Sequence, residues 1–174
     1  ETLGEPADED GITSLERGSL AHEILDRFLT ESLEALEVPS PDTPWGPAHH
    51  QRIDVICDEE FALVELRGLT GRPLLWQRDG GQLRQALHEF LLDDNERRSN
   101  NLLTPIAAEM AFGLDGNKPL ILHLADGRPL RFRGRIDRVD RAVDGGLVVT
   151  DFKTGKKEYY PQISEDSPDA NGQY

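Results

Sequence analysis

The first part of the chain has apolar residues at three- and four-residue spacing, the pattern of an amphipathic helix. We predict a helix over residues 15–36, with Ser14 as the capping residue at its start. Four prolines within residues 39–47 end this helix. Its apolar stripe would comprise Leu15, His22, Leu25, Leu29, Leu33 and Leu36.

Two further helices are predicted before the pattern changes. They span residues 48–66 and 73–95, although Gly80 and Gly81 weaken the second. In the helix over 48–66, the side chains expected to face inward are Ile53, Ile56, Phe61 and Val64.

From residue 102 onward, shorter extended segments replace the helical pattern. Turn signals stand at Asp126-Gly127 and at Asp144-Gly145-Gly146. Helices followed by an antiparallel meander place the chain in the α+β class. The expected strands cover residues 103–112, 120–124, 130–141 and 147–153.

The composition of the 174 residues fits one domain, and its net charge of −14 argues against a protein that coats nucleic acid generally. A single cysteine, Cys57, excludes an internal disulfide framework and a four-cysteine metal site made by this segment alone. No apolar run approaches the ~20 residues that cross a bilayer, and no signal peptide opens the sequence, so we expect a cytoplasmic setting without membrane contact. Because the first residue is Glu1, we expect the chain to be a piece of a longer protein.

Charge is distributed unevenly along the chain. Residues 128–157 contain nine basic and four acidic residues and carry +5, so the remainder carries −19. Such a basic ribbon on an acidic body can engage a polyanion locally, or it can simply keep an exposed sheet face in water.

The last two expected strands place two aspartates opposite each other. If their turn is centred on Asp144, Asp137 faces Asp151, and alternation puts Lys153 on the same face while Ile136 and Phe152 face the core. Two opposed carboxylates destabilise a sheet unless a cation lies between them, and oxygen ligands suit Mg²⁺ or Mn²⁺. The alternatives are a register slipped by one residue, or two carboxylates that point to water.

His22 either ligates the same cation, which would favour Mn²⁺, or is an ordinary partly buried histidine.

Three segments resemble the motifs of RecB-like and AddB-like nucleases in the PD-(D/E)XK superfamily. Residues 17–25 resemble the histidine motif, residues 134–140 the second motif, and residues 151–156 the D-x-K signature. The resemblance implies a restriction-endonuclease-like fold with a central mixed, mostly antiparallel sheet flanked by helices. It implies one nuclease domain over 1–174, truncated at its C-terminal end, with residues 38–100 as a helical insertion.

Carried over by position, the resemblance implies metal binding by His22, Asp137, Asp151 and the backbone carbonyl of Phe152. Asp137, Asp151 and Lys153 would be catalytic, with Lys153 orienting or activating the attacking water. Glu109 is a candidate accessory acid, although an exposed glutamate on a strand is the commoner explanation. The nucleic-acid backbone would be held by Arg131, Arg133 and Arg135 of the basic ribbon.

The expected activity is therefore that of a Mg²⁺- or Mn²⁺-dependent deoxyribonuclease, the exonuclease module of a helicase–nuclease in double-strand break repair. Its partners would be DNA, as a single strand or a duplex end, and a fused or separate helicase. The alternative is a nuclease-fold module of a repair complex that binds DNA or another partner without cleaving. Many relatives in this family carry an iron–sulfur cluster with cysteines on either side of the nuclease motifs; Cys57 fits neither position, and the sequence leaves a cluster in a longer protein open.

Overall fold

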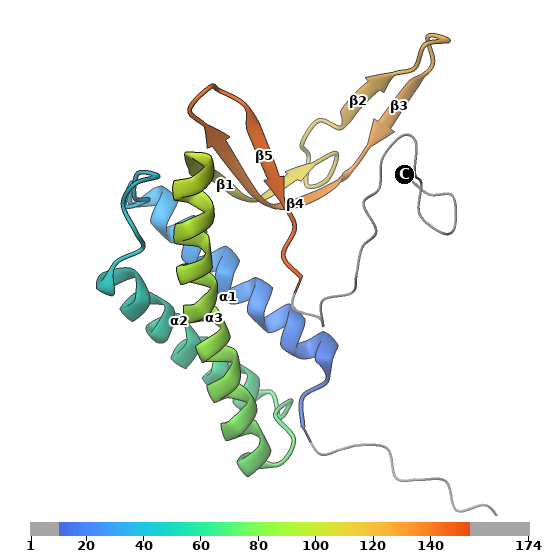
Figure 1. Ribbon diagram of the computed structural model, residues 1–174. Helices are drawn as coiled ribbons and strands as arrows, with labels where there is room; N and C mark the ends of the chain where they lie inside the picture. The colour runs from blue at the N-terminus through green and yellow to red at the C-terminus, as the bar shows by residue number, and fades with distance from the viewer. Residues whose placement is uncertain (1–10, 154–174) are drawn as a thin grey trace, which may run out of the picture.

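The computed structural model describes residues 11–153, in which three helices precede five strands (Figure 1). The helices are α1 (Ser14–Glu34), α2 (Pro47–Leu66) and α3 (Pro73–Asn101). The strands are β1 (Leu103–Phe112), β2 (Leu120–His123), β3 (Pro129–Phe132), β4 (Gly134–Ala142) and β5 (Leu147–Thr150). None of the helices in this part of the chain is long and apolar enough to cross a membrane.

Helix α1 begins one residue earlier than a Ser14 cap would place it. Thr13 is the capping residue: its hydroxyl accepts from the backbone N–H of Glu16, and the Glu16 carboxylate accepts from the backbone N–H of Thr13. Ser14 was therefore the wrong cap. Leu15 and Leu36 are exposed rather than inward, because they lie in the first turn and beyond the last one. The buried face comprises Leu20, Ala21, Ile24, Leu25, Phe28, Leu29 and Ser32.

Helices α2 and α3 share one hydrophobic core with α1. Ile53, Ile56 and Phe61 are buried as predicted. Helix α3 runs to Asn101, beyond the predicted end, and passes through Gly80, where a Cβ atom would lie 3.3 Å from the Phe61 ring. The glycine thus permits close helix packing instead of breaking the helix. The segment predicted as an insertion is helical, and it contributes to the core on which α1 rests.

The strands form a three-stranded sheet and a separate hairpin, not a continuous meander. The sheet order is β1-β4-β5, and β2 pairs only with β3; every pair among the described strands is antiparallel. The meander prediction was wrong because the turn after β1 diverts the chain: Gly113 has φ +65°, and a Cβ there would lie 2.7 Å from the Arg133 Cβ. At this crossing the expected strand over 130–141 divides into β3 and β4, and the hairpin, here called the β2–β3 arm, extends away from the helices (Figure 1).

The β4–β5 hairpin has the predicted register. Val139 pairs with Val149 and Arg138 pairs with Thr150, as a turn centred on Asp144 requires. Strand β5 ends at Thr150, however, so the ladder stops before Asp151. The expected strand end at residue 153 was therefore too late, and Asp151 is not a ladder partner of Asp137.

A buried charged cluster joins α3 to β4. Asp94 of α3 accepts from the indole N–H of Trp45 at 2.8 Å and lies 2.9 Å from the Arg138 guanidinium and 3.2 Å from that of Arg98. Asp140 binds the other side of Arg138 at 2.7 Å and also binds Arg97 at 2.7 Å. Two buried carboxylates thus bind three guanidinium groups. Each carboxylate neutralises positive charge that would otherwise be buried without a partner.

We predict that Asp94→Ala lowers the free energy of unfolding by about 3–5 kcal/mol, because the buried Arg98 loses its carboxylate partner and the buried Arg138 keeps only Asp140. Urea denaturation measures the change. The matched control is Asp93→Ala, which removes an exposed carboxylate from the preceding position and should change stability by no more than about 0.5 kcal/mol. Equal effects of the two substitutions would contradict the role assigned to Asp94.

Candidate metal centre

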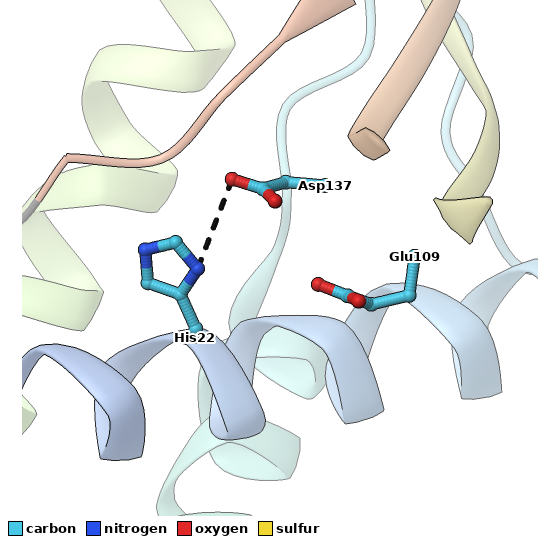
Figure 2. A group of neighbouring side chains, drawn as sticks. All are labelled: His22, Glu109 and Asp137. Carbon is cyan, nitrogen blue, oxygen red and sulfur yellow. Dashed lines mark ion pairs between the residues drawn. The ribbon is translucent and has the colours of Figure 1, made fainter. Parts of the chain in front are cut away.

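Three side chains from three elements converge beneath the sheet (Figure 2). His22 comes from α1, Glu109 from β1 and Asp137 from β4, and one ligand atom of each lies within 4.8 Å of the others. The His22 Nδ1 is 3.7 Å from an Asp137 carboxylate oxygen. All three side chains are partly buried, so each is only partly accessible to water.

The β1–β4 pairing brings the two carboxylates together. Ala108 pairs with Arg138 and Met110 pairs with Ile136, so Glu109 lies opposite Asp137. Glu109 itself has φ +43°, a left-handed backbone that is uncommon for a residue other than glycine. Opposed like charges and a left-handed residue are both unfavourable, and such features persist where the surrounding structure holds them in place.

The surroundings of Glu109 disfavour its charged form. Burial raises the pKa of the Glu109 carboxyl, and the nearby Asp26 and Asp137 carboxylates raise it further; Arg135 and His22 oppose them. Asp26 lies one helical turn after His22, and burial also raises the pKa of its carboxyl. The site therefore carries excess negative charge that a cation would relieve.

The chain after β5 returns to Asp137. The backbone N–H of Phe152 donates to the Asp137 carboxylate at 2.5 Å, and the Phe152 ring is buried in the core. That ring makes an edge contact with His22, with centroids 5.9 Å apart. Phe152 thus fixes the position of both Asp137 and the imidazole, and Phe152 faces the core as the alternation predicts.

Asp151 and Lys153 lie on either side of Phe152 but outside the group of three. Their side chains are 61% and 69% exposed and form an ion pair with each other at 2.6 Å. The structure therefore brings together His22, Asp137 and the accessory candidate Glu109, while the Asp151 carboxylate does not join them. Since β5 ends at Thr150, the side chain of Asp151 is not held on the face that carries Asp137.

A cleft adjoins His22, and neither Glu109 nor Asp137 is among the residues that line it. The cleft has a volume of about 510 Å³ and lies between the first turns of α1 and residues 152–153, which follow β5. Gly18 and Ser19 form part of its wall, and His22, Phe152 and Lys153 also line it. Two of the predicted site residues, His22 and Lys153, thus face a common space.

The three predicted DNA-contact arginines have different surroundings. Arg131 lies on β3, and Arg133 lies where β3 meets β4; among the described residues neither is paired with an acid. Arg135 on β4 is instead held by two acids, Asp115 at 2.9 Å and Glu109 at 3.6 Å. The basic ribbon is therefore not uniform.

The chain matches, over residues 1–171, the family described as the PD-(D/E)XK nuclease superfamily. The chain belongs to this superfamily. Membership in the PD-(D/E)XK superfamily agrees with the observed α+β fold and confirms the resemblance drawn from the three motifs.

The related proteins are named as subunits of an ATP-dependent helicase/deoxyribonuclease. The protein of Clostridium botulinum is 28% identical over 149 residues, covering 82% of this chain and 12% of its own length. That of Clostridium tetani is 22% identical over 85% of this chain and 13% of its own length, and that of Pelotomaculum thermopropionicum is 39% identical over 44% and 7%. This PD-(D/E)XK chain therefore spans a small fraction of the relatives that it matches.

The sequence pattern indicated one residue of the site only weakly, Glu109, and did not indicate another, Asp26. Glu109 was held only as an accessory acid, because its position opposite Asp137 depends on the pairing of β1 with β4 across the β2–β3 arm. Asp26 was not singled out, although its spacing of four residues from His22 places the two on one helix face. That spacing is the signal that was available.

We predict that Glu109→Gln raises the melting temperature in EDTA at pH 7.5. Because the folded protein raises the pKa of Glu109, the stabilisation from its neutral form is complete below the ordinary pKa and is lost as pH rises through the raised one. The gain from the substitution should therefore disappear near pH 4, about the ordinary pKa of a glutamate.

Glu23→Gln on α1 is the matched control, since Glu23 is exposed, and it should leave the melting temperature unchanged at both pH values. A lower melting temperature for Glu109→Gln at pH 7.5 would show that the ionised carboxylate stabilises the metal-free fold, contrary to the prediction.

Proposed function

We propose that the chain is a divalent-metal-dependent nuclease module that hydrolyses phosphodiester bonds in DNA. The observation that carries the proposal is the convergence of His22, Glu109 and Asp137, in a member of the PD-(D/E)XK superfamily. From membership in this superfamily we extend the assignment to metal dependence, to DNA as the substrate and to exonuclease action.

The donor set fits Mg²⁺ or Mn²⁺. Two carboxylates supply hard oxygen ligands, and one imidazole shifts the preference toward Mn²⁺. The pKa of Glu109 is raised despite the nearby Arg135, and Glu109 lies opposite Asp137; both observations indicate a site with excess negative charge. We propose Asp151 and the backbone carbonyl of Phe152 as further ligands, because they lie next to the N–H group that contacts Asp137.

A bound metal ion supplies Lewis-acid activation of water and neutralises charge on the phosphate. Asp137 and His22 would hold their positions because Phe152 contacts both through its N–H group and its ring. Lys153, at the cleft beside His22, is proposed to orient the attacking water and to offset negative charge that develops on the phosphate.

The strand would be held beside the site through its backbone. Arg131 and Arg133 are exposed, and the β2–β3 arm leads directly into β4, which carries Asp137. Contacts from arginine to phosphate are independent of sequence, so we propose retention without base recognition. Affinity from two such contacts is small, because each adds little at physiological salt and the remainder of the chain is acidic.

The relatives named as helicase/deoxyribonuclease subunits suggest a setting for the reaction. We propose that a fused or partner helicase delivers the strand to this module as an exonuclease in double-strand break repair. The second candidate is a module that keeps the fold and binds DNA without cleaving it. The exposure of Asp151 and its ion pair with Lys153, outside the group of three, is the observation that favours this second candidate.

The test is cleavage of linear DNA by the protein at its natural length with Mn²⁺ present. Asp137→Asn, Asp151→Ala and Lys153→Ala should each reduce the rate by roughly a hundredfold or more, since each removes metal binding or charge stabilisation. Glu23→Gln on α1 should cleave at the wild-type rate.

Binding of the same DNA is measured beside cleavage. Loss of cleavage with binding retained in Lys153→Ala supports the nuclease assignment. Wild-type protein that binds DNA but does not cleave it supports the second candidate, and equal cleavage by all variants would remove the assignment.

A further inference from the structure

Arg135 occupies a position between the proposed metal site and a second acid. It lies two residues before Asp137 on β4, so the two side chains share a face of the sheet. Its guanidinium is 3.6 Å from the Glu109 carboxylate on one side and 2.9 Å from the Asp115 carboxylate on the other. Arg135 thus offsets part of the negative charge around Glu109, together with His22.

The two contacts of Arg135 are unequal. The approach to Asp115 is a hydrogen bond, whereas 3.6 Å to Glu109 is too long for one. Glu109 is the more buried acid, with 23% of its side chain exposed against 67% for Asp115. The guanidinium is therefore anchored at the exposed acid and reaches the buried one only electrostatically.

The backbone holds Asp115 in place for this contact. Asp115 lies in the turn between β1 and β2 with φ +52°, between two glycines that also have positive φ, Gly113 and Gly116. A left-handed aspartate is tolerated where its short side chain is used locally. The turn that diverts the β2–β3 arm thus also supplies the second acceptor for Arg135.

We propose that Arg135 is a placeholder cation: it partly neutralises Glu109 when the site holds no metal, and Asp115 retains the guanidinium when a divalent ion takes Glu109. Arg135 is in this view a positioning residue that lowers metal affinity, rather than a contact to the nucleic-acid backbone. The inference rests on the proposed metal site.

The proposal predicts opposite effects of two substitutions on Mn²⁺ affinity, measured by electron paramagnetic resonance of free Mn²⁺. Arg135→Gln should tighten binding by roughly three- to tenfold, because a positive charge near the ion is removed. Asp115→Asn should weaken binding by roughly two- to fivefold, because the guanidinium loses its alternative acceptor and competes fully for Glu109.

A double-substitution cycle separates this mechanism from a simple change of net charge. If Asp115 acts through Arg135, the protein with both Arg135→Gln and Asp115→Asn binds Mn²⁺ as tightly as the Arg135→Gln protein. If Asp115 contributes only its charge, Asp115→Asn weakens binding equally in both backgrounds, which would overturn the proposal.

Two controls complete the experiment. Arg135→Lys keeps the charge and should remain within about twofold of wild type. Arg141→Gln removes a charge from the exposed far end of the same strand and should likewise change affinity less than about twofold. Tightening by Arg141→Gln as large as that by Arg135→Gln would also overturn the proposal.

Asp137→Asn distinguishes failure of this inference from failure of the proposed function. Loss of Mn²⁺ binding in Asp137→Asn together with unchanged affinity in Arg135→Gln overturns only the role of Arg135. Wild-type affinity in Asp137→Asn overturns the metal site, and the placeholder with it.

Discussion

The position of β4 depends on the buried charges that join it to α3. Asp94 and Asp140 hold the Arg138 guanidinium between them, and Arg138 is fully buried. Because side chains alternate along a strand, anchoring Arg138 and Asp140 toward α3 directs Asp137 to the opposite face, toward α1. The charged cluster and the candidate metal centre thus lie on opposite faces of β4. The contacts of the charged cluster with α3 therefore determine where Asp137 lies.

On the other face, the fold holds an arrangement that a structural sheet would avoid. Glu109 and Asp137 are opposed across β1 and β4, with Asp26 near them and a left-handed backbone at Glu109. Proteins retain unfavourable local features of this kind mainly at functional sites, where a ligand relieves them. Helix α1 adds His22 to the same place, because its buried neighbours Ala21 and Leu25 fix the rotation of the helix against the core.

Local patterns predicted what is local in this fold. The range of β1 and the register of β4 with β5 followed from alternation and from the Asp144-Gly145 turn, because a tight turn fixes which residues oppose each other. The three helices were likewise found from their apolar spacing, apart from their exact ends.

The pairing of β1 with β4 was not predictable in this way, because the β2–β3 arm separates these strands in the sequence. A meander was the simplest interpretation of successive strands, and only the close approach of Gly113 to Arg133 shows why the chain takes another course. For the same reason Glu109 was held only as an accessory candidate, whereas the structure places it opposite Asp137 on β1 and leaves the Asp151 carboxylate outside the group of three.

The most direct measurement is anomalous diffraction from a crystal soaked in Mn²⁺. We predict a peak at coordination distance from the His22 imidazole and from the Glu109 and Asp137 carboxylates. In the same crystal, the Arg135 guanidinium should be hydrogen-bonded to the Asp115 carboxylate. A peak bound by Asp151 without Glu109 or His22, or no peak within reach of Asp137, would contradict the central claim.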